Sequence, residues 1–192
     1  MGGGYLGQAG LFLVETVFGL YILAVLLRFL FQLVRADFYN PISQFLVTVT
    51  NPPLRPLRRL VPGLWGVDLA AVVLLVALSV LKIYLLLFLS GQAAHPAGVV
   101  VLAVADLIST VVWIFIIAVF IRVILSWVNP GGYNPALGLL YSLTEPLMRP
   151  ARRLLPPVGG LDLSPIVVFV LLYLSRFLIV APLMDLGRVL AQ

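Results

Sequence analysis

The sequence offers few of the side chains that carry chemistry in water. Its 192 residues include no cysteine and one histidine, His95, and only 10% of them are charged. A disulfide framework, a thiolate metal site and a cysteine nucleophile are therefore excluded. We also find no Ser-His-Asp set on one face, and we expect no enzymatic activity, no metal site and no cofactor. We interpret His95 as a turn residue beside Pro96, with a haem ligand as the alternative.

Apolar residues are present in large excess. They make up 62% of the chain, with a mean hydropathy of +1.17, whereas an ordinary globular domain is about 45 to 50% apolar. Four runs reach the roughly 20 residues that span a bilayer as helix, at residues 11–34, 69–89, 105–128 and 163–186. The third run begins earlier, at Ala97, so its helix can start before residue 105. The sequence predicts an all-α membrane protein with four transmembrane helices.

The positions of the basic residues predict how the chain is oriented in the membrane. The chain has 12 Lys and Arg against 7 Asp and Glu, and the basic residues outside the spans concentrate in two connectors. The segment 90–98 and the N-terminus have none. By the positive-inside rule both connectors are cytoplasmic, and both termini and the His95 turn lie outside. Because the basic residues alternate with apolar runs, we expect anionic lipid headgroups and not nucleic acid as the counter-charge.

The chain is an internal repeat with an offset of 94 residues. At that offset, 17 of the 42 positions from Arg28 to Leu69 are identical. The kept residues include arginines, prolines and an aspartate, although the apolar positions have drifted. Each unit, at residues 1–96 and 97–192, has one span, one connector and a second span. Each unit crosses the membrane twice, so the two hairpins share an orientation and their axis runs along the membrane normal. A plain duplication with two stacked hairpins would explain the repeat equally well.

Each connector is expected to begin with a short amphipathic helix. Asparagine caps a helix and proline suits its first position, as in Asn40-Pro41 and Asn134-Pro135. The helix would run for about ten residues and end before proline, at Pro52 in the first copy and at Pro146 in the second. It would lie in the interface or re-enter the membrane. The apolar faces expected are Ile42, Phe45, Leu46 and Val49, and in the copy Ala136, Leu139, Leu140 and Leu143.

Arginine clusters follow these helices with the same spacing in both copies. They are Arg55, Arg58 and Arg59, and Arg149, Arg152 and Arg153. One interpretation is a topology anchor, since an anionic leaflet attracts each such residue by about 1 kcal/mol. The other is a binding site for a lipid headgroup or an acidic partner.

Ionisable groups inside spans cost about 2.5 to 3.5 kcal/mol each on insertion scales, which makes them functional candidates. Depth along the helices, at about 1.5 Å per residue, predicts four ion pairs within the repeats. These are Glu15 with Lys82, Asp106 with Arg176, Arg28 with Asp68, and Arg122 with Asp162. We interpret them as pins that hold each hairpin together. The alternative is a polar path for an ion, with Glu15 and Lys82 as the best candidates.

The duplicated unit resembles the YggT family of small bacterial membrane proteins, also called YlmG and present in chloroplasts. The residues that carry the resemblance are Asn40-Pro41, Thr50, Pro52, Arg55-Pro56, Arg58-Arg59, Pro62 and Asp68, and in the second copy Asn134-Pro135, Thr144-Glu145-Pro146, Arg149-Pro150, Arg152-Arg153, Pro156 and Asp162. The first copy departs from the motif, with Asn51 where the second has Glu145.

The resemblance implies a non-enzymatic protein of the bacterial inner membrane. Members of the family have been connected with osmotic or extracytoplasmic stress and ion balance, with cell division and nucleoid organisation, and in chloroplasts with assembly of a b-type cytochrome. We therefore hypothesise a membrane scaffold or assembly factor that presents its arginine clusters to anionic lipid or to another membrane protein. The alternative is a small ion channel or transporter, which would need a homo-oligomer because four spans are few for a pore.

Overall fold

The computed structural model describes residues 4–64, 66–128, 134–155 and 162–192. The first repeat contains α1 (Tyr5–Leu33), α2 (Pro41–Leu60) and α3 (Leu69–Leu89). The second contains α4 (Pro96–Val128), α5 (Pro135–Leu154), α6 (Ser164–Ser175), the π-helical turn η1 (Arg176–Val180) and α7 (Ala181–Ala191). Pro156 of the repeat motif lies outside the described residues.

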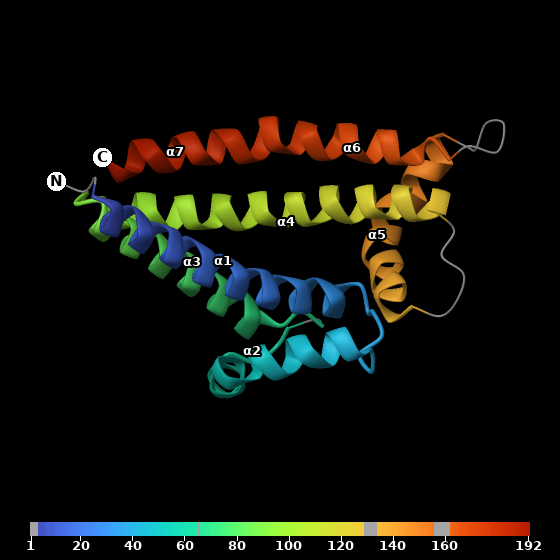
Figure 1. The fold of residues 1–192 in the computed structure, drawn as a ribbon, viewed down its shortest axis with the longest axis horizontal. Helices are drawn as coiled ribbons and strands as arrows, with labels where there is room; N and C mark the ends of the chain where they lie inside the picture. The colour runs from blue at the N-terminus through green and yellow to red at the C-terminus, as the bar shows by residue number, and fades with distance from the viewer. Residues whose placement is uncertain (1–3, 65, 129–133, 156–161) are drawn as a thin grey trace.

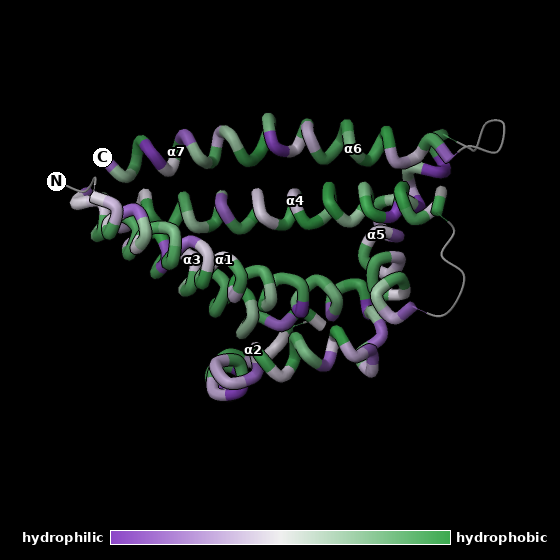
Figure 2. Tube along the Cα trace, in the orientation of Figure 1, coloured by the Kyte–Doolittle hydropathy of each residue, from purple (hydrophilic) through white to green (hydrophobic). Residues whose placement is uncertain are grey.

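The four predicted spans are confirmed. α1, α3, α4 and the continuous α6–η1–α7 are long and apolar enough to cross a membrane, and Figure 2 shows them largely in the colour of hydrophobic residues. α1 has 29 residues and α4 has 33, or about 44 and 50 Å of helix. Both exceed a hydrocarbon core of about 30 Å, so they tilt or protrude.

The two hairpins run in the same direction. Both described ends of the chain and the turn between α3 and α4 lie at one end of the molecule, and α2 and α5 lie toward the other (Figure 1). Within the repeats, α1 packs against α3, and α4 packs against α6 and α7. The repeats are joined mainly by α3, which packs against α4 as well as α1. The resulting core includes Val25, Leu26, Ala71, Leu75 and Leu107.

Two glycines allow α4 and α7 to approach closely. A Cβ atom at Gly98 would lie 2.2 Å from the backbone nitrogen of Ala191, and one at Gly187 would lie 2.8 Å from the Leu102 side chain. The backbone N–H of His95 also donates to the Ala191 carbonyl at 3.0 Å. Small residues at such contacts are how helices pack in lipid, where no hydrophobic effect drives them together.

The prediction that Pro52 and Pro146 end the connector helices is wrong. α2 continues to Leu60 and α5 to Leu154, each with prolines in its interior. A proline inside a helix can kink it without ending it, and α2 changes direction along its length (Figure 1). Pro53 leaves the carbonyl of Val49 without its helical donor, and the hydroxyl of Tyr21 on α1 donates to that carbonyl at 3.4 Å.

α2 is buried against the rest of the protein along one side, which contains Ser43, Leu46, Thr50 and Leu54. Three residues of the predicted apolar face, Ile42, Phe45 and Val49, are exposed, as a face that lies in the membrane interface would be. The polar residues can be buried because they have hydrogen-bond partners: Ser43 donates to the Asp37 carbonyl at 2.9 Å, and Thr50 receives a bond from α1. In α5 the predicted Leu139 and Leu143 are buried.

The fourth span is interrupted by the π-helical turn η1. Pro182 follows this turn in the first turn of α7 and has no N–H to donate to the preceding turn. A wider turn at this point accommodates the missing hydrogen bond, as π-bulges do elsewhere. The turn begins at Arg176, the counterpart of Lys82 in the first repeat.

Candidate functional site

The connector helices start as the sequence predicts. The side chain of Asn40 accepts from the backbone N–H of Ile42 and that of Asn134 from Ala136, both at 2.9 Å. Pro41 and Pro135 occupy the first turns. The amide of Asn40 also donates to the carbonyl of Pro135 at 2.7 Å. That hydrogen bond connects the two connectors to each other.

The predicted pairs of Arg28 with Asp68 and of Arg122 with Asp162 do not form. Asp68 caps α3 through the N–H of Ala71, as expected, but its ion pair is with Arg58. Asp162 pairs with Arg152, Nε to Oδ2 at 3.1 Å. The predictions took depth along the spans as the guide, whereas the unbroken connector helices bring their own arginines back to these aspartates.

In the second repeat, Arg122 has a carboxylate partner. Its Nη2 pairs with Glu145 at 2.9 Å and its Nη1 donates to the Thr144 hydroxyl at 2.7 Å. Its guanidinium also lies 4.7 Å from the centre of the Tyr141 ring. Glu145 continues to Arg152 at 3.2 Å. Two arginines and two carboxylates, counting Asp162, therefore form one connected network.

Asp162 ends this network outside the span. Burial alone would raise its pKa, but hydrogen bonds from Ser164 and from Arg152 outweigh that effect and the pKa is lowered. The carboxylate therefore remains charged at neutral pH, as its pairing with Arg152 requires.

In the first repeat, the equivalent arginine has no such partner. Arg28 is 9% exposed and donates from Nη1 to the Thr50 hydroxyl at 2.7 Å and to the Val47 carbonyl at 3.4 Å. These acceptors are neutral, and Arg28 forms no ion pair within the part of the chain that the structure describes. The position of Glu145 is taken by Asn51, which cannot supply a negative charge.

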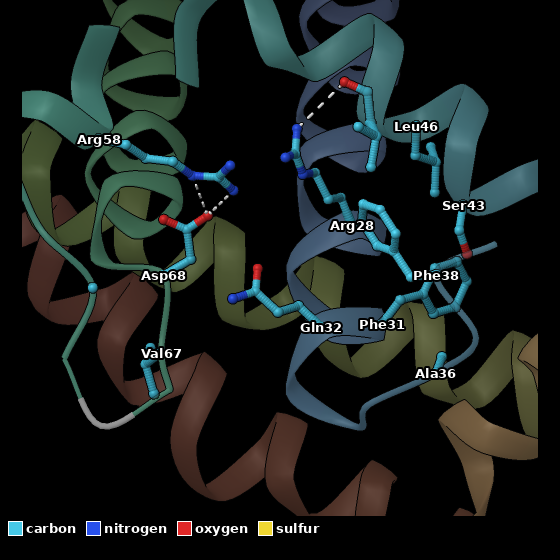
Figure 3. Close-up of a pocket in the computed structure, with 12 residues that line it drawn as sticks. Arg28, Phe31, Gln32, Ala36, Phe38, Ser43, Leu46, Arg58, Val67 and Asp68 are labelled. Atoms are coloured by element: carbon cyan, nitrogen blue, oxygen red, sulfur yellow. Dashed lines mark hydrogen bonds and ion pairs between the residues drawn. The ribbon is translucent and has the colours of Figure 1, made fainter. Parts of the chain in front are cut away.

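Arg28 lines a cavity of about 520 Å³, which we call the first cavity. Arg58, held by Asp68, stands on one side of it and Arg28 on the other (Figure 3). Phe31 and Leu46 contribute apolar walls. The corresponding second cavity, of about 570 Å³, is lined by the neutralised Arg122, Arg152 and Asp162.

The other cluster arginines point outward. Arg58 and Arg152 make the internal contacts described above, and the remaining four are exposed: Arg55, Arg59, Arg149 and Arg153. Sequence reasoning missed the roles of Thr50 and Thr144 as acceptors for the buried arginines. Their identity in both copies was the available signal.

The charges in the half of the spans nearer the chain termini also pair differently from the prediction. Lys82 does not meet Glu15; its ammonium lies 2.5 Å from the carboxylate of Asp106 on α4. Arg176 does not meet Asp106; its guanidinium lies 4.5 Å from the centre of the Trp113 ring. Glu15 is exposed. The cause is the contact of α3 with α4, which brings a carboxylate from the other repeat to Lys82.

The described residues contain no group of three or more His, Asp and Glu side chains that could hold a metal ion. The backbone N–H of Ala97 donates to Nδ1 of His95 at 3.3 Å, so the ring lies at the start of α4. This is the turn position expected from the sequence.

The family model named CCB3/YggT matches the chain twice, at residues 7–89 and 101–183. The chain belongs to the CCB3/YggT family. The two matches are 94 residues apart, the offset at which the sequence repeats, so the tandem CCB3/YggT repeats are confirmed.

Relatives extend along most of the chain. A protein of Pseudomonas aeruginosa is 45% identical over 177 residues, which are 91% of this chain and 90% of the relative. YggT of Escherichia coli (strain K12) is 37% identical over 183 residues, 93% of each chain. The protein ycf19 of Guillardia theta is 38% identical over 60 residues, 31% of this chain and 66% of the relative. None of these names states an activity, and no solved structure matches this CCB3/YggT chain.

Proposed function

We propose that this multi-pass membrane protein is a non-enzymatic scaffold or assembly factor that binds anionic phospholipid headgroups at its connectors. We place it in the bacterial inner membrane, with the connectors cytoplasmic and both termini outside, and we assign its role to osmotic or extracytoplasmic stress. The observation that carries the proposal is the buried guanidinium of Arg28, which lines the first cavity and forms no ion pair among the described residues.

Electrostatics favour a bound anion beside Arg28. A buried charge is costly unless a counter-charge lies close to it. In the second repeat, Glu145 provides that counter-charge to Arg122. In the first repeat Asn51 replaces the glutamate, and Asp68, which also lines the first cavity, is already paired with Arg58. We therefore infer that a further counter-charge comes from another molecule. A phosphate group suits the site because guanidinium groups bind phosphate oxygens through paired N–H donors.

The first cavity has the size and walls that a phospholipid headgroup needs. Its volume of about 520 Å³ is within the range of small-ligand pockets, roughly 300 to 1,000 Å³. Arg28 and the Nη1 group of Arg58, whose Nε and Nη2 bond Asp68, offer donors to the phosphate. Phe31 and Leu46 offer apolar contact to the glycerol and upper acyl carbons. The side chain of Arg58 is 38% exposed, so the cavity can be reached from outside.

The exposed arginines add attraction without selectivity. Each contributes about 1 kcal/mol toward an anionic leaflet. An acidic partner protein could occupy the same surface. Charge reversal tests both: Arg55→Glu, Arg59→Glu, Arg149→Glu and Arg153→Glu together should weaken lipid and partner binding, and unchanged binding of both would refute a role for the exposed arginines.

The ion-channel alternative has less support. Its best candidate, Lys82, forms an ion pair with Asp106 and is thereby better suited to holding α3 against α4. Potassium or sodium flux through the protein in liposomes, if it changed on Lys82→Met or Glu15→Gln, would favour the channel over the scaffold.

The sharpest test exchanges the residue that differs between the repeats. Purified protein is analysed by native mass spectrometry with phosphatidylglycerol or phosphatidylcholine added. Asn51→Glu should place a carboxylate beside Arg28, as in the second repeat, and weaken phosphatidylglycerol binding by about tenfold, from the roughly 1.5 kcal/mol of a charge-assisted hydrogen bond. Asn51→Gln is the neutral control and should bind like the wild type.

The reciprocal exchange should have the opposite effect. Glu145→Gln removes the counter-charge of Arg122 and should allow a second phosphatidylglycerol to bind, at the second cavity. Equal binding of both lipids by the wild type, or undiminished phosphatidylglycerol binding by Asn51→Glu, would refute the proposed site.

A further inference from the structure

The contact between the two repeats provides a pattern for a second contact. On α3, the hydroxyl of Ser79 donates to the carbonyl of Ala103 on α4 at 3.3 Å, and Lys82 pairs with Asp106 at 2.5 Å. Ser79 and Ala103 are fully buried. The second helix of one repeat thus packs against the first helix of the next.

The fourth span repeats the α3 side of this contact, and α1 repeats the α4 side. Both of these surfaces are exposed in this chain. At the offset of 94, Tyr173 and Arg176 take the places of Ser79 and Lys82, and Ala9 and Phe12 take those of Ala103 and Asp106. Tyr173 is 44% exposed and Phe12 is 67% exposed. Among the described residues, α1 makes no extensive contact with α6, η1 or α7, and α4 lies between α1 and the composite fourth span (Figure 1).

The open surface of the fourth span is a groove of about 410 Å³, which we call the outer groove. Arg176, Tyr173 and Phe177 line it together with Ser109 of α4. Asp185 and Arg188 also line it, and they pair with each other at 3.0 Å. The cation of Arg176 rests on the Trp113 ring, but no carboxylate pairs with it in the described parts of the chain. Where Lys82 finds a carboxylate from the next helix, Arg176 faces an open groove.

The open surface of α1 carries the matching charge. Glu15 is exposed within the span and forms no ion pair among the described residues. It lies three residues from Phe12, about 4.5 Å further along the helix, and a guanidinium reaches across that distance. Charges of opposite sign, each costly in lipid, therefore stand on the two surfaces that the repeat makes complementary.

We propose that the outer groove binds the N-terminal half of α1 from a second copy of this chain, so that Arg176 pairs with Glu15 of that copy. The contact joins two different surfaces, so it is heterologous and generates a ring or a row of copies in place of a two-fold dimer. All copies keep one orientation in the membrane, because the repeats that set the pattern share theirs.

The absence of native cysteine makes cross-linking specific. The test variant is Ala9→Cys with Tyr173→Cys, oxidised in native membranes. We expect a ladder of trimers and larger multiples, because each copy carries both halves of the contact. Each single variant should give dimers at most. Ser79→Cys with Ala103→Cys, which should form a bridge within one chain, shows that oxidation reaches such a contact.

A second control places the cysteine on the same face of α1 but at a different depth in the membrane. Leu20 is exposed on α1 and lies 11 residues, about 16 Å, from Ala9, so Leu20→Cys with Tyr173→Cys should give no ladder. No ladder from the test variant, with the bridge within the chain formed, would overturn the proposal. Bands that are not multiples of the chain mass would show a different protein in the groove and would also overturn it.

The ion pair is tested by charge reversal in the same background. Glu15→Lys or Arg176→Glu alone should remove most of the ladder, and the two together should restore it. A ladder that is insensitive to both reversals would refute the assigned pair.

Discussion

Replacing Gly98 by alanine should separate the start of α4 from the end of α7. The added Cβ would lie 2.2 Å from the backbone nitrogen of Ala191 and 2.4 Å from its Cα atom. Backbone atoms cannot rotate aside as a side chain can, so α7 must move. That movement would also break the hydrogen bond from the His95 N–H to the Ala191 carbonyl.

The magnitude follows from three contributions. Overpacking at a tight contact costs about 1 to 3 kcal/mol, and the lost hydrogen bond adds about 1 kcal/mol. Alanine recovers up to about 1 kcal/mol through its higher helix propensity. We therefore expect a net loss of about 1 to 3 kcal/mol, and each kcal/mol lowers the melting temperature of a chain of this size by about 2 to 4 °C.

The assay is thermal unfolding in detergent, combined with hydrogen exchange of residues 185–192. Gly138→Ala is the matched control, because a Cβ atom at Gly138 in α5 meets nothing within 4 Å. We expect Gly98→Ala to melt lower and to exchange faster in this segment, and Gly138→Ala to do neither. Wild-type melting and exchange for Gly98→Ala would show that the close approach of α4 and α7 is not needed.

Two further predictions concern the ion pairs. Lys82→Met leaves Asp106 without its partner and should lower the free energy of unfolding by about 1 to 3 kcal/mol. The double variant Lys82→Met with Asp106→Leu should recover most of that loss in thermal melts. No recovery would contradict a pairing role. The pKa of Asp162 is lowered in the folded protein, so its stabilisation is complete above the unfolded pKa and is lost as pH falls below about 4. Asp162→Asn should flatten the melting temperature over that pH range, and an unchanged pH profile would argue against the pairing with Arg152.

The spans and the repeat could be predicted from sequence because both depend on local information. Hydropathy over about 20 residues identifies a span, and an offset of 94 is visible in the residues themselves. The caps at Asn40 and Asn134 were also predictable, since a cap depends on residues two positions apart.

The partners of the charges could not be predicted in the same way. Depth along a helix gives the level of Lys82 but does not say whether α1 or α4 stands beside it. α2 continues beyond Pro52, and the Val49 carbonyl that Pro53 leaves free accepts from Tyr21 on another helix. Such contacts depend on how the helices pack. In the sequence, only the replacement of Glu145 by Asn51 in the first copy indicates that Arg28 and Arg122 have different surroundings.

The hydrogen bond from Asn40 to Pro135 joins the starts of the two connector helices. One side chain caps α2 and also bonds the first turn of α5. The connector that carries Asn51 and the connector that carries Glu145 therefore begin at a shared contact, although the buried arginines beside them differ in their counter-charge.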